Sequence, residues 1–290
     1  MNVVLLHEPA RVDELRAFLT ARGFSLAQRP HALLFAQREG VNVAAYGTGK
    51  LLLGGPQAEE FAGVLVGQDL ARREVRVTGP FTPHAGSDES GKGDYFGPLA
   101  VASVYVPTRE VAEALVRAGV RDSKALAPGL VGPLASLVKA RCPHAVVTIA
   151  PPTYNETYAR FGNLNHMLAW AHARAIEDLL AQTGVVPVLV DQFARGVLQR
   201  HLMPLGKQAD VREKVRAESD VPVAAASVVA RAEFLAGLAR ASRKIGFPLP
   251  RGAGPAVTQA AREVVGEKGF EALGKVAKMH FAITHGVRGA

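Results

Sequence analysis

Short apolar runs of strand length, separated by turn residues, dominate the first 75 residues of the chain. The exception is the segment 11–23, where Leu15, Phe18 and Leu19 recur at helical spacing before Gly23. Two glycine-containing dipeptides further along provide hairpin turns between strands. The pattern predicts a curved antiparallel sheet backed by helices, with strands at 3–6, 32–37, 41–48 and 51–53 and helices at 11–23 and 58–66.

A different pattern starts near residue 84, where longer apolar runs mix with amphipathic helical segments. The stretch before it has little periodicity and contains Pro80 and Pro83, which is typical of a linker. We therefore expect a domain at 1–75, a linker at 76–83 and a second domain at 84–290. Strands followed by mixed strands and helices favour an α/β architecture with a mixed sheet. The predicted strands are 84–88, 99–106, 145–149 and 187–191, and the predicted helices are 125–140, 165–182, 223–244, 258–265 and 270–279.

The composition is that of a folded globular protein, with 48% hydrophobic and 21% charged residues in 290. A net charge of +8 suits a polyanionic partner such as a nucleic acid. Cys142 is the single cysteine, which excludes an intrachain disulfide and a cysteine-cluster zinc site. The sequence has neither a signal-peptide pattern at its start nor an apolar run approaching about 18 residues. We therefore expect a cytoplasmic protein that does not insert in a membrane.

Two adjacent carboxylates, Asp88 and Glu89, are the most informative feature of the sequence. They precede the apolar run 99–106, and carboxylates next to a core strand are costly unless a cation neutralises them. Gly91-Lys92-Gly93 follows at once, and its glycines let backbone N–H groups approach a polar ligand while its lysine adds a positive charge. Mg²⁺ takes oxygen ligands, often together with substrate phosphates. The combination favours chemistry on a phosphodiester, with a solvated turn as the alternative.

Chemistry of this kind needs carboxylates from several separate elements. Asp191 ends an apolar strand pattern, and Glu218 and Asp220 precede a helix of small residues that can pack closely against a sheet. Each acid has a structural alternative: a cap or turn for Asp191, and favourable charge at a helix N-terminus for the other two. Asp122 is either a further ligand or a loop acid that holds Lys124. The residues alone leave these alternatives open.

Other catalytic motifs are missing from the sequence. The histidines do not form a close pair with metal-ligand spacing, and His166 and His172 lie six residues apart on one predicted helix. We interpret both as core or hydrogen-bonding residues. There is no Gly-x-x-x-x-Gly-Lys-Ser/Thr loop and no Gly-x-Ser-x-Gly, which argues against a nucleoside-triphosphate motor and a serine hydrolase.

The segment 88–98, Asp-Glu-Ser-Gly-Lys-Gly-Asp-Tyr-Phe-Gly-Pro, resembles the motif of bacterial ribonuclease HIII, a type 2 ribonuclease H. The resemblance continues in family order through roughly residues 84–285. The first unit resembles the N-terminal domain of that family in the order of its elements. The further matching motifs are Asp122-Ser-Lys124, Gly162-Asn-Leu-Asn-His166 with Ala169-Trp-Ala-His172, Val190-Asp-Gln-Phe193, Ala217-Glu-Ser219 with Ala224-Ala-Ala-Ser-Val228, and Lys278-Met-His-Phe281.

The resemblance implies a ribonuclease H-like mixed sheet with flanking helices, and a small N-terminal α+β domain similar to half of the TATA-binding protein. It implies a monomer that binds an RNA/DNA hybrid and cleaves the RNA strand endonucleolytically with two divalent ions, Mg²⁺ or Mn²⁺. The expected ends are a 5′-phosphate and a 3′-hydroxyl. Related ribonucleases HII have an aspartate as the fourth acid, so Asp220 is the alternative to Glu218. The implied catalytic and metal-binding residues are Asp88, Glu89, Asp191 and Glu218, and the implied substrate contacts are Gly91, Lys92, Gly93, Ser123 and Lys124.

Two other functions are compatible with the sequence. A ribonuclease HII-like enzyme would nick DNA at single embedded ribonucleotides. A non-catalytic nucleic-acid-binding protein would rely on a basic N-terminal module, and its acids would be structural. Metal-dependent turnover of a hybrid separates this last class from an enzyme.

Overall fold

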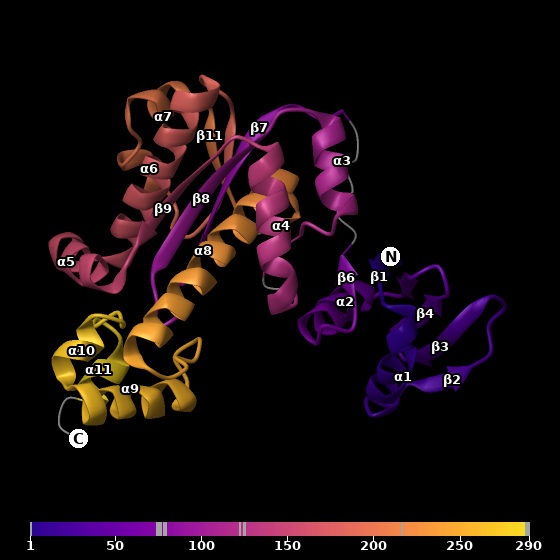
Figure 1. Ribbon diagram of the computed structural model, residues 1–290. Coiled ribbons are helices and arrows are strands. Elements are labelled where there is room, and N and C mark those ends of the chain that lie inside the picture. Colours follow the sequence, from indigo (N-terminus) through magenta and orange to yellow (C-terminus); the bar gives the residue numbers. More distant parts are fainter. Residues whose placement is uncertain are drawn as a thin grey trace. The chain divides into compact units, whose positions relative to one another are not determined.

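The computed structural model describes residues 2–73, 77, 80–121, 123, 126–215 and 217–287. The chain divides into two compact units, residues 1–76 and 77–290, and each contains its own sheet (Figure 1). The expected linker at 76–83 includes positions outside the described residues, so the exact domain boundaries stay a prediction.

The first unit is a six-stranded antiparallel sheet of order β2-β3-β4-β5-β1-β6. Its two helices pack on one face of the sheet, because Leu15 and Leu65 share a core with Val43 and Leu53. The periodicity predicted four of the strands and both helices, but not the short edge strands. The elements are β1 (Asn2–Leu6), a 3-10 turn (Pro9–Arg11), α1 (Val12–Thr20), β2 (Ser25–Ala27), β3 (Ala32–Arg38), β4 (Val41–Tyr46), β5 (Lys50–Gly54), α2 (Ala58–Gly67) and β6 (Arg72–Arg73).

The second unit contains the predicted mixed sheet, with the order β11-β10-β7-β8-β9. The strand β10 is parallel to both β7 and β11, whereas β8 is antiparallel to its two neighbours. Four of the five strands coincide with predicted ones, and the edge strand β11 was not predicted. The bounds are β7 (His84–Ser90), β8 (Leu99–Val106), β9 (His144–Ile149), β10 (Val188–Asp191) and β11 (Val211–Lys214).

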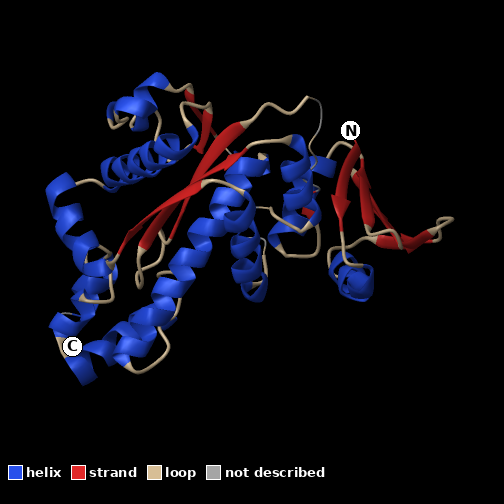
Figure 2. Ribbon diagram, turned by 45° about the horizontal axis from the view of Figure 1, so that its top comes forward, coloured by secondary structure: helices blue, strands red, loops and turns tan. Residues whose placement is uncertain are grey.

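Helices cover both faces of this sheet (Figure 2). On one face Val101 packs with Leu168 of α6, and on the other Ala100 packs with Phe234 of α8, as the alternation of side chains along a strand requires. The helices are α3 (Arg109–Arg117), α4 (Pro128–Arg141), α5 (Pro151–Phe161), α6 (Leu164–Thr183), α7 (Pro204–Gln208), α8 (Val221–Ile245), α9 (Pro255–Lys268), α10 (Phe270–Gly274) and α11 (Ala282–Val287), with 3-10 turns at Leu198–Arg200 and Ala217–Ser219.

The long helix α8 lies directly against β7. A Cβ atom at Gly86 would lie 2.1 Å from the backbone nitrogen of Val223, so only glycine permits this approach. Among the described residues α8 is the one helix long and apolar enough to be considered for a membrane span, but 67% of its most apolar window is buried inside the protein. It is the core helix of the second unit, and α9, α10 and α11 gather around its C-terminal end (Figure 1).

Two helix predictions need correction. The helix expected at 270–279 ends at Gly274, because the chain then turns and Ala277 forms a β-bridge with Phe96. The helix expected from residue 125 begins at Pro128, which occupies the first helical turn; Ala125 lies outside the described residues. The helices α3, α5, α7 and α11 were not predicted.

Candidate active site

The strand β7 presents the first two acids to opposite faces of the sheet. Glu89 points toward α6, where its Oε2 lies 3.1 Å from Nε2 of His172. Asp88 points toward α8, where the hydroxyl of Ser227 donates a hydrogen bond to it. Each of the adjacent carboxylates therefore meets a polar side chain of a different covering helix.

Asp191 joins the pair from the neighbouring strand. In the parallel pairing of β10 with β7, Val190 lies opposite Ser87, so the next positions are Asp191 and Asp88. The backbone N–H of Ala217 donates to Oδ1 of Asp191 at 2.9 Å. Three predicted acids thus meet at one edge of the sheet, where the two parallel strands end.

The mutual proximity of these acids affects the ionisation of Asp88. Burial raises the pKa of the Asp88 carboxyl to about 8, and the charges of Glu89 and Asp191 act in the same direction. Hydrogen bonds from the backbone of Glu89 and from Ser227 oppose the shift only in part. A cation beside the carboxyl would relieve the same repulsion, so the environment favours either a proton or a metal ion there.

The two candidates for a fourth acid differ in their local contacts. Glu218 lies in the 3-10 turn next to Ala217, whose backbone holds Asp191. Asp220 is the N-cap of α8: its Oδ1 accepts from the N–H of Val223 at 3.3 Å, and its Oδ2 lies 2.9 Å from Nε2 of His84. Asp220 is therefore occupied with helix capping and an ion pair.

The glycine-rich turn between β7 and β8 borders the acids. Gly91 has φ +88°, and a Cβ there would lie 2.3 Å from the carbonyl oxygen of Pro98. Gly93, in contrast, faces open space, and a Cβ atom at this position would meet no other atom within 4 Å. Lys92 places Nζ 3.6 Å from Oε1 of Glu89 and 5.8 Å from the centre of the Phe193 ring. The turn is rigid at its first glycine and accessible at its second.

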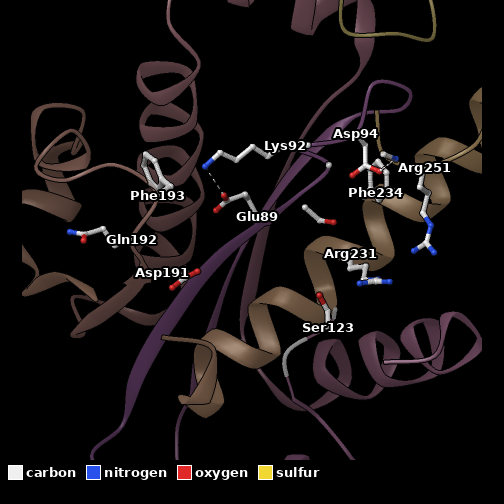
Figure 3. A pocket seen from close by; sticks show the side chains of 14 residues that line it. Glu89, Lys92, Asp94, Ser123, Asp191, Gln192, Phe193, Arg231, Phe234 and Arg251 are labelled. Atoms are coloured by element: carbon white, nitrogen blue, oxygen red, sulfur yellow. Dashed lines mark hydrogen bonds and ion pairs between the residues drawn. The ribbon is translucent and has the colours of Figure 1, made fainter. Parts of the chain in front are cut away.

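A cleft of about 660 Å³ opens over these groups. Glu89, Lys92 and Phe193 lie on one side of it, and Asp94, Arg231 and Arg251 on the other (Figure 3). Of the remaining predicted substrate contacts, Ser123 lines the cleft, with Oγ 2.7 Å from Oγ of Ser227, whereas Lys124 and also Asp122 lie outside the described residues. The cleft is lined by Glu89, Ser90, Gly91, Lys92, Gly93, Asp94, Ser123, Asp191, Gln192, Phe193, Arg231, Phe234, Arg251 and Gly252.

A buried lysine fixes the turn from behind. Lys278 is fully buried and donates from Nζ to the carbonyl oxygens of Asp94 at 2.7 Å and Gly97 at 2.8 Å. Burial lowers the pKa of Lys278 to about 7, and the charge of Asp94 opposes this shift. Asp94 in turn accepts from the N–H of Gly252 at 2.7 Å, which links the turn to the loop that carries Arg251.

Sequence reasoning missed several of these contacts. It interpreted His166 and His172 as core or hydrogen-bonding residues, which the structure confirms, but it assigned no partner to either of them. It found no close histidine pair, whereas Nδ1 of His166 lies 2.9 Å from Nε2 of His201. Arg231 and Arg251 carry no local motif and were not predicted as lining residues. Tyr95 and Phe96 are fully buried and belong to the core, not the cleft.

The donor set suits a hard divalent cation. Carboxylate oxygens are the ligands of Mg²⁺ and Mn²⁺, and Mg²⁺ usually keeps waters and substrate phosphates in addition to one or two carboxylates. Within the described part of the chain, no three His, Cys, Asp or Glu side chains lie close enough together to hold a metal ion by themselves. Mg²⁺ or Mn²⁺ at these acids would therefore need further ligands, such as water or substrate phosphate oxygens.

Comparison with known proteins agrees with this geometry. The family model described as Ribonuclease HII matches residues 85–284, which includes the whole acidic cluster. The chain is thus a type 2 ribonuclease H.

The relatives narrow the class further. The chain is 37% identical to the ribonuclease HIII of Protochlamydia amoebophila over 284 residues, which cover 96% of this chain and 93% of that protein. It is also similar to the crystal structure of Bst-RNase HIII in complex with Mn²⁺ (TM-score 0.65, 31% identity, 99% and 98% of the two chains) and to that of Aquifex aeolicus RNase H3 (TM-score 0.57, 28% identity, 96% and 99%). The chain belongs to the ribonuclease HIII family.

Proposed function

We propose that this protein hydrolyses the RNA strand of RNA/DNA hybrids endonucleolytically, with two divalent ions, Mg²⁺ or Mn²⁺, and leaves 5′-phosphate and 3′-hydroxyl ends. The observation that carries the proposal is the convergence of Asp88, Glu89 and Asp191 at the ends of two parallel strands, where Glu89 and Asp191 line one cleft together with the Gly91–Gly93 turn. The Mn²⁺ complex of the related Bst-RNase HIII supports the use of a divalent ion.

The four acids would hold the ions. Glu89 and Asp191 lie close enough to Asp88 for their charges to raise its pKa. Glu218 is the fourth candidate, because Asp220 already caps α8. When bound, two ions would lower the pKa of the attacking water and stabilise the leaving 3′-oxygen. Lys92 lies beside Glu89 at the edge of the cleft and would contact a substrate phosphate.

Selection of RNA would come from the glycine turn. The 2′-hydroxyl is the group that distinguishes RNA from DNA at a given site. The space at Gly93 lets the backbone approach a ribose, and the close packing of Gly91 against Pro98 and the buried Lys278 keep the turn in place. The turn would therefore contact the 2′-hydroxyl next to the scissile phosphate.

The first unit would add affinity for the hybrid without contributing to the chemistry. Its element order supports the expected similarity to half of the TATA-binding protein, and Arg22, Arg29, Arg38 and Lys50 lie near its turns. We further propose that the protein acts as a monomer in the cytoplasm, where hybrids form.

Cleavage of three end-labelled substrates tests this function. A continuous RNA/DNA hybrid, a DNA duplex with one embedded ribonucleotide and an all-DNA duplex are incubated with the protein and Mg²⁺ or Mn²⁺. We expect internal cuts throughout the hybrid, no cut in DNA, and 3′ ends that a polymerase extends without further treatment. Cleavage of the single-ribonucleotide duplex in preference to the hybrid would instead indicate a ribonuclease HII-like activity, and the absence of metal-dependent cleavage would indicate a binding protein.

A further inference from the structure

A chain of buried hydrogen bonds ends at Glu89. His172 is fully buried in α6, with Nε2 3.1 Å from Oε2 of Glu89 and Nδ1 2.8 Å from Oγ of Ser87. The hydroxyl of Ser103 lies 3.0 Å from that of Ser87, and the hydroxyl of Ser87 lies 3.1 Å from the carbonyl oxygen of Ala102. Four polar side chains in the core are thus connected in series.

The protons in this chain can be assigned from its members. A carboxylate only accepts, so the proton in the 3.1 Å contact between Nε2 of His172 and Oε2 of Glu89 belongs to Nε2. Nδ1 is then the acceptor of the neutral ring, and the hydroxyl of Ser87 at 2.8 Å can donate to it. Ser103 donates in turn to Ser87. The network therefore holds the ring in the orientation that presents Nε2–H to Glu89.

The imidazole ring of His172 also contacts the segment that follows Asp191. Its plane stacks on Phe193 with ring centres 5.0 Å apart and an angle of 13°. Phe193 follows Asp191 in the chain and lines the cleft. With Oε2 of Glu89 held by the imidazole, Oε1 is the oxygen on the side of Lys92. One buried side chain thus contacts Glu89 itself and the segment that follows Asp191.

We propose that His172 is a positioning residue that holds Glu89 in its metal-binding orientation through the Ser103–Ser87–His172 chain. This inference rests on the proposed function, in which Glu89 binds a divalent ion. Groups that orient metal ligands from behind typically affect metal affinity or activity by about 10–100-fold when they are changed. A histidine that served only to fill space would be replaceable by an apolar residue of similar size without such an effect.

The test uses Mn²⁺ alone, with affinity measured by electron paramagnetic resonance on the full-length protein without hybrid. His172→Leu removes both hydrogen bonds at similar volume, whereas His172→Gln keeps an N–H donor near the position of Nε2. The matched control is His166→Leu on the same helix, since His166 contacts His201 and not the acids. Thermal unfolding establishes that each variant is folded, and kcat and KM are measured separately on the hybrid.

We expect His172→Leu to weaken Mn²⁺ binding by about 10–100-fold and to lower kcat while KM for the hybrid changes less. His172→Gln should recover most of the affinity, and His166→Leu should match the wild type. Wild-type Mn²⁺ affinity in folded His172→Leu would overturn the proposal. If that variant does not fold, Ser87→Ala decides: it removes the hydrogen-bond partner of Nδ1 and should weaken Mn²⁺ binding, and unchanged affinity in that variant would overturn the proposal as well.

The outcomes separate this inference from the proposed function. If the wild type binds Mn²⁺ and cleaves the hybrid, and His172→Leu does both equally well, only the positioning role of His172 is wrong. A wild-type protein that neither binds Mn²⁺ nor cleaves the hybrid contradicts the proposed function itself.

Discussion

The two units bury different kinds of side chain. Within the described part of the first unit His7 is the one buried polar residue, and the rest of that core is apolar. The second unit buries several polar or charged side chains, and most of them point to the acidic cluster or to the turn beside it. These are Ser87, Ser103, Ser123, His172, Ser227, Lys278 and Thr284.

This difference indicates that apolar packing stabilises the fold of each unit, whereas buried hydrogen bonds position the side chains of the site. Burying a polar group is unfavourable unless it is hydrogen-bonded, so a stable core does not need such groups. In the second unit they are paired, and the pairs lead to Glu89, Asp88 and the turn at 91–94. The location of buried polar groups therefore marks the unit that carries out the chemistry.

The charge is also divided unequally. The first unit has nine Lys and Arg against eight Asp and Glu, a net charge of +1, whereas the second has 25 against 18, a net charge of +7. Several arginines of the first unit lie over aromatic rings, for example Arg22 over Phe18 at 3.7 Å. The idea of a basic N-terminal module that dominates binding is therefore not supported by the distribution of charge.

The largest expected effect separates the two acids at the start of α8. Glu218→Gln should reduce hybrid cleavage by several orders of magnitude with little change in stability, because it removes a charge that helps to hold two ions. Asp220→Ala should keep most of the activity but lower the free energy of unfolding by about 1–2 kcal/mol, since it removes the cap of α8 and the partner of His84. Single-turnover cleavage and denaturant unfolding measure the two effects, and an inactive Asp220→Ala with an active Glu218→Gln would reverse the assignment.

The two glycines of the turn form the next matched pair. Gly91→Ala should destabilise the protein by about 2 kcal/mol or more, because its φ is +88° and its Cβ would overlap the carbonyl of Pro98. Gly93→Ala should leave stability unchanged and raise KM for the hybrid by about tenfold, equivalent to about 1.4 kcal/mol. Wild-type kinetics for Gly93→Ala would argue against a backbone contact with the ribose.

Removal of the first unit tests its role directly. A protein lacking residues 1–76, shown to be folded by circular dichroism, should have a KM for the hybrid raised by up to about tenfold and a kcat that changes less. Because that unit has a net charge of only +1, the dependence of log K on log[salt], roughly 0.7–0.9 per neutralised phosphate, should be largely retained. An unchanged KM would rule out the binding role of the first unit. Loss of the salt dependence would show that the first unit makes most of the phosphate contacts.

The last prediction of this series concerns Lys278 and pH. The unfolded chain holds the lysine proton up to about pH 10.4, whereas the pKa of the folded protein is lowered to about 7 by burial. Between these values folding releases a proton, so the stability contributed by this residue rises with pH. The wild type should gain up to about 1.4 kcal/mol per pH unit relative to Lys278→Met between pH 7 and 10. A stability difference that does not change with pH would show that the lysine is charged in the fold.

Much of the fold follows from periodicity, and its exceptions have clear causes. The largely buried, apolar β4 and the long apolar α8 gave strong signals, whereas β2 is exposed at all three positions. The helix α3 is short and rich in charge, and its Thr108 cap is a weak local signal. The end of α10 depends on pairing with Phe96, far away in the sequence, so no local pattern predicts it.

The site was predictable only where a residue stands beside a strand pattern. Asp88, Glu89 and Asp191 flank apolar strands, and the structure brings them together. The partners that fix them come from elsewhere: His172 is 83 residues from Glu89, and Lys278 is 184 residues from Asp94. Such contacts depend on which face of α6 or of the C-terminal segment meets the sheet, and periodicity does not specify the partner.

The most direct test of the account is the activity of Asp191→Asn on a continuous hybrid at saturating Mg²⁺. Asparagine keeps the acceptor for the N–H of Ala217, so the fold and hybrid binding should remain, while the charge that helps to hold the ions is lost. We expect cleavage to fall by several orders of magnitude with an unchanged Kd for the hybrid. Cleavage within about tenfold of the wild type, which is about 1.4 kcal/mol of activation free energy, would contradict the assignment of these acids as the catalytic metal ligands.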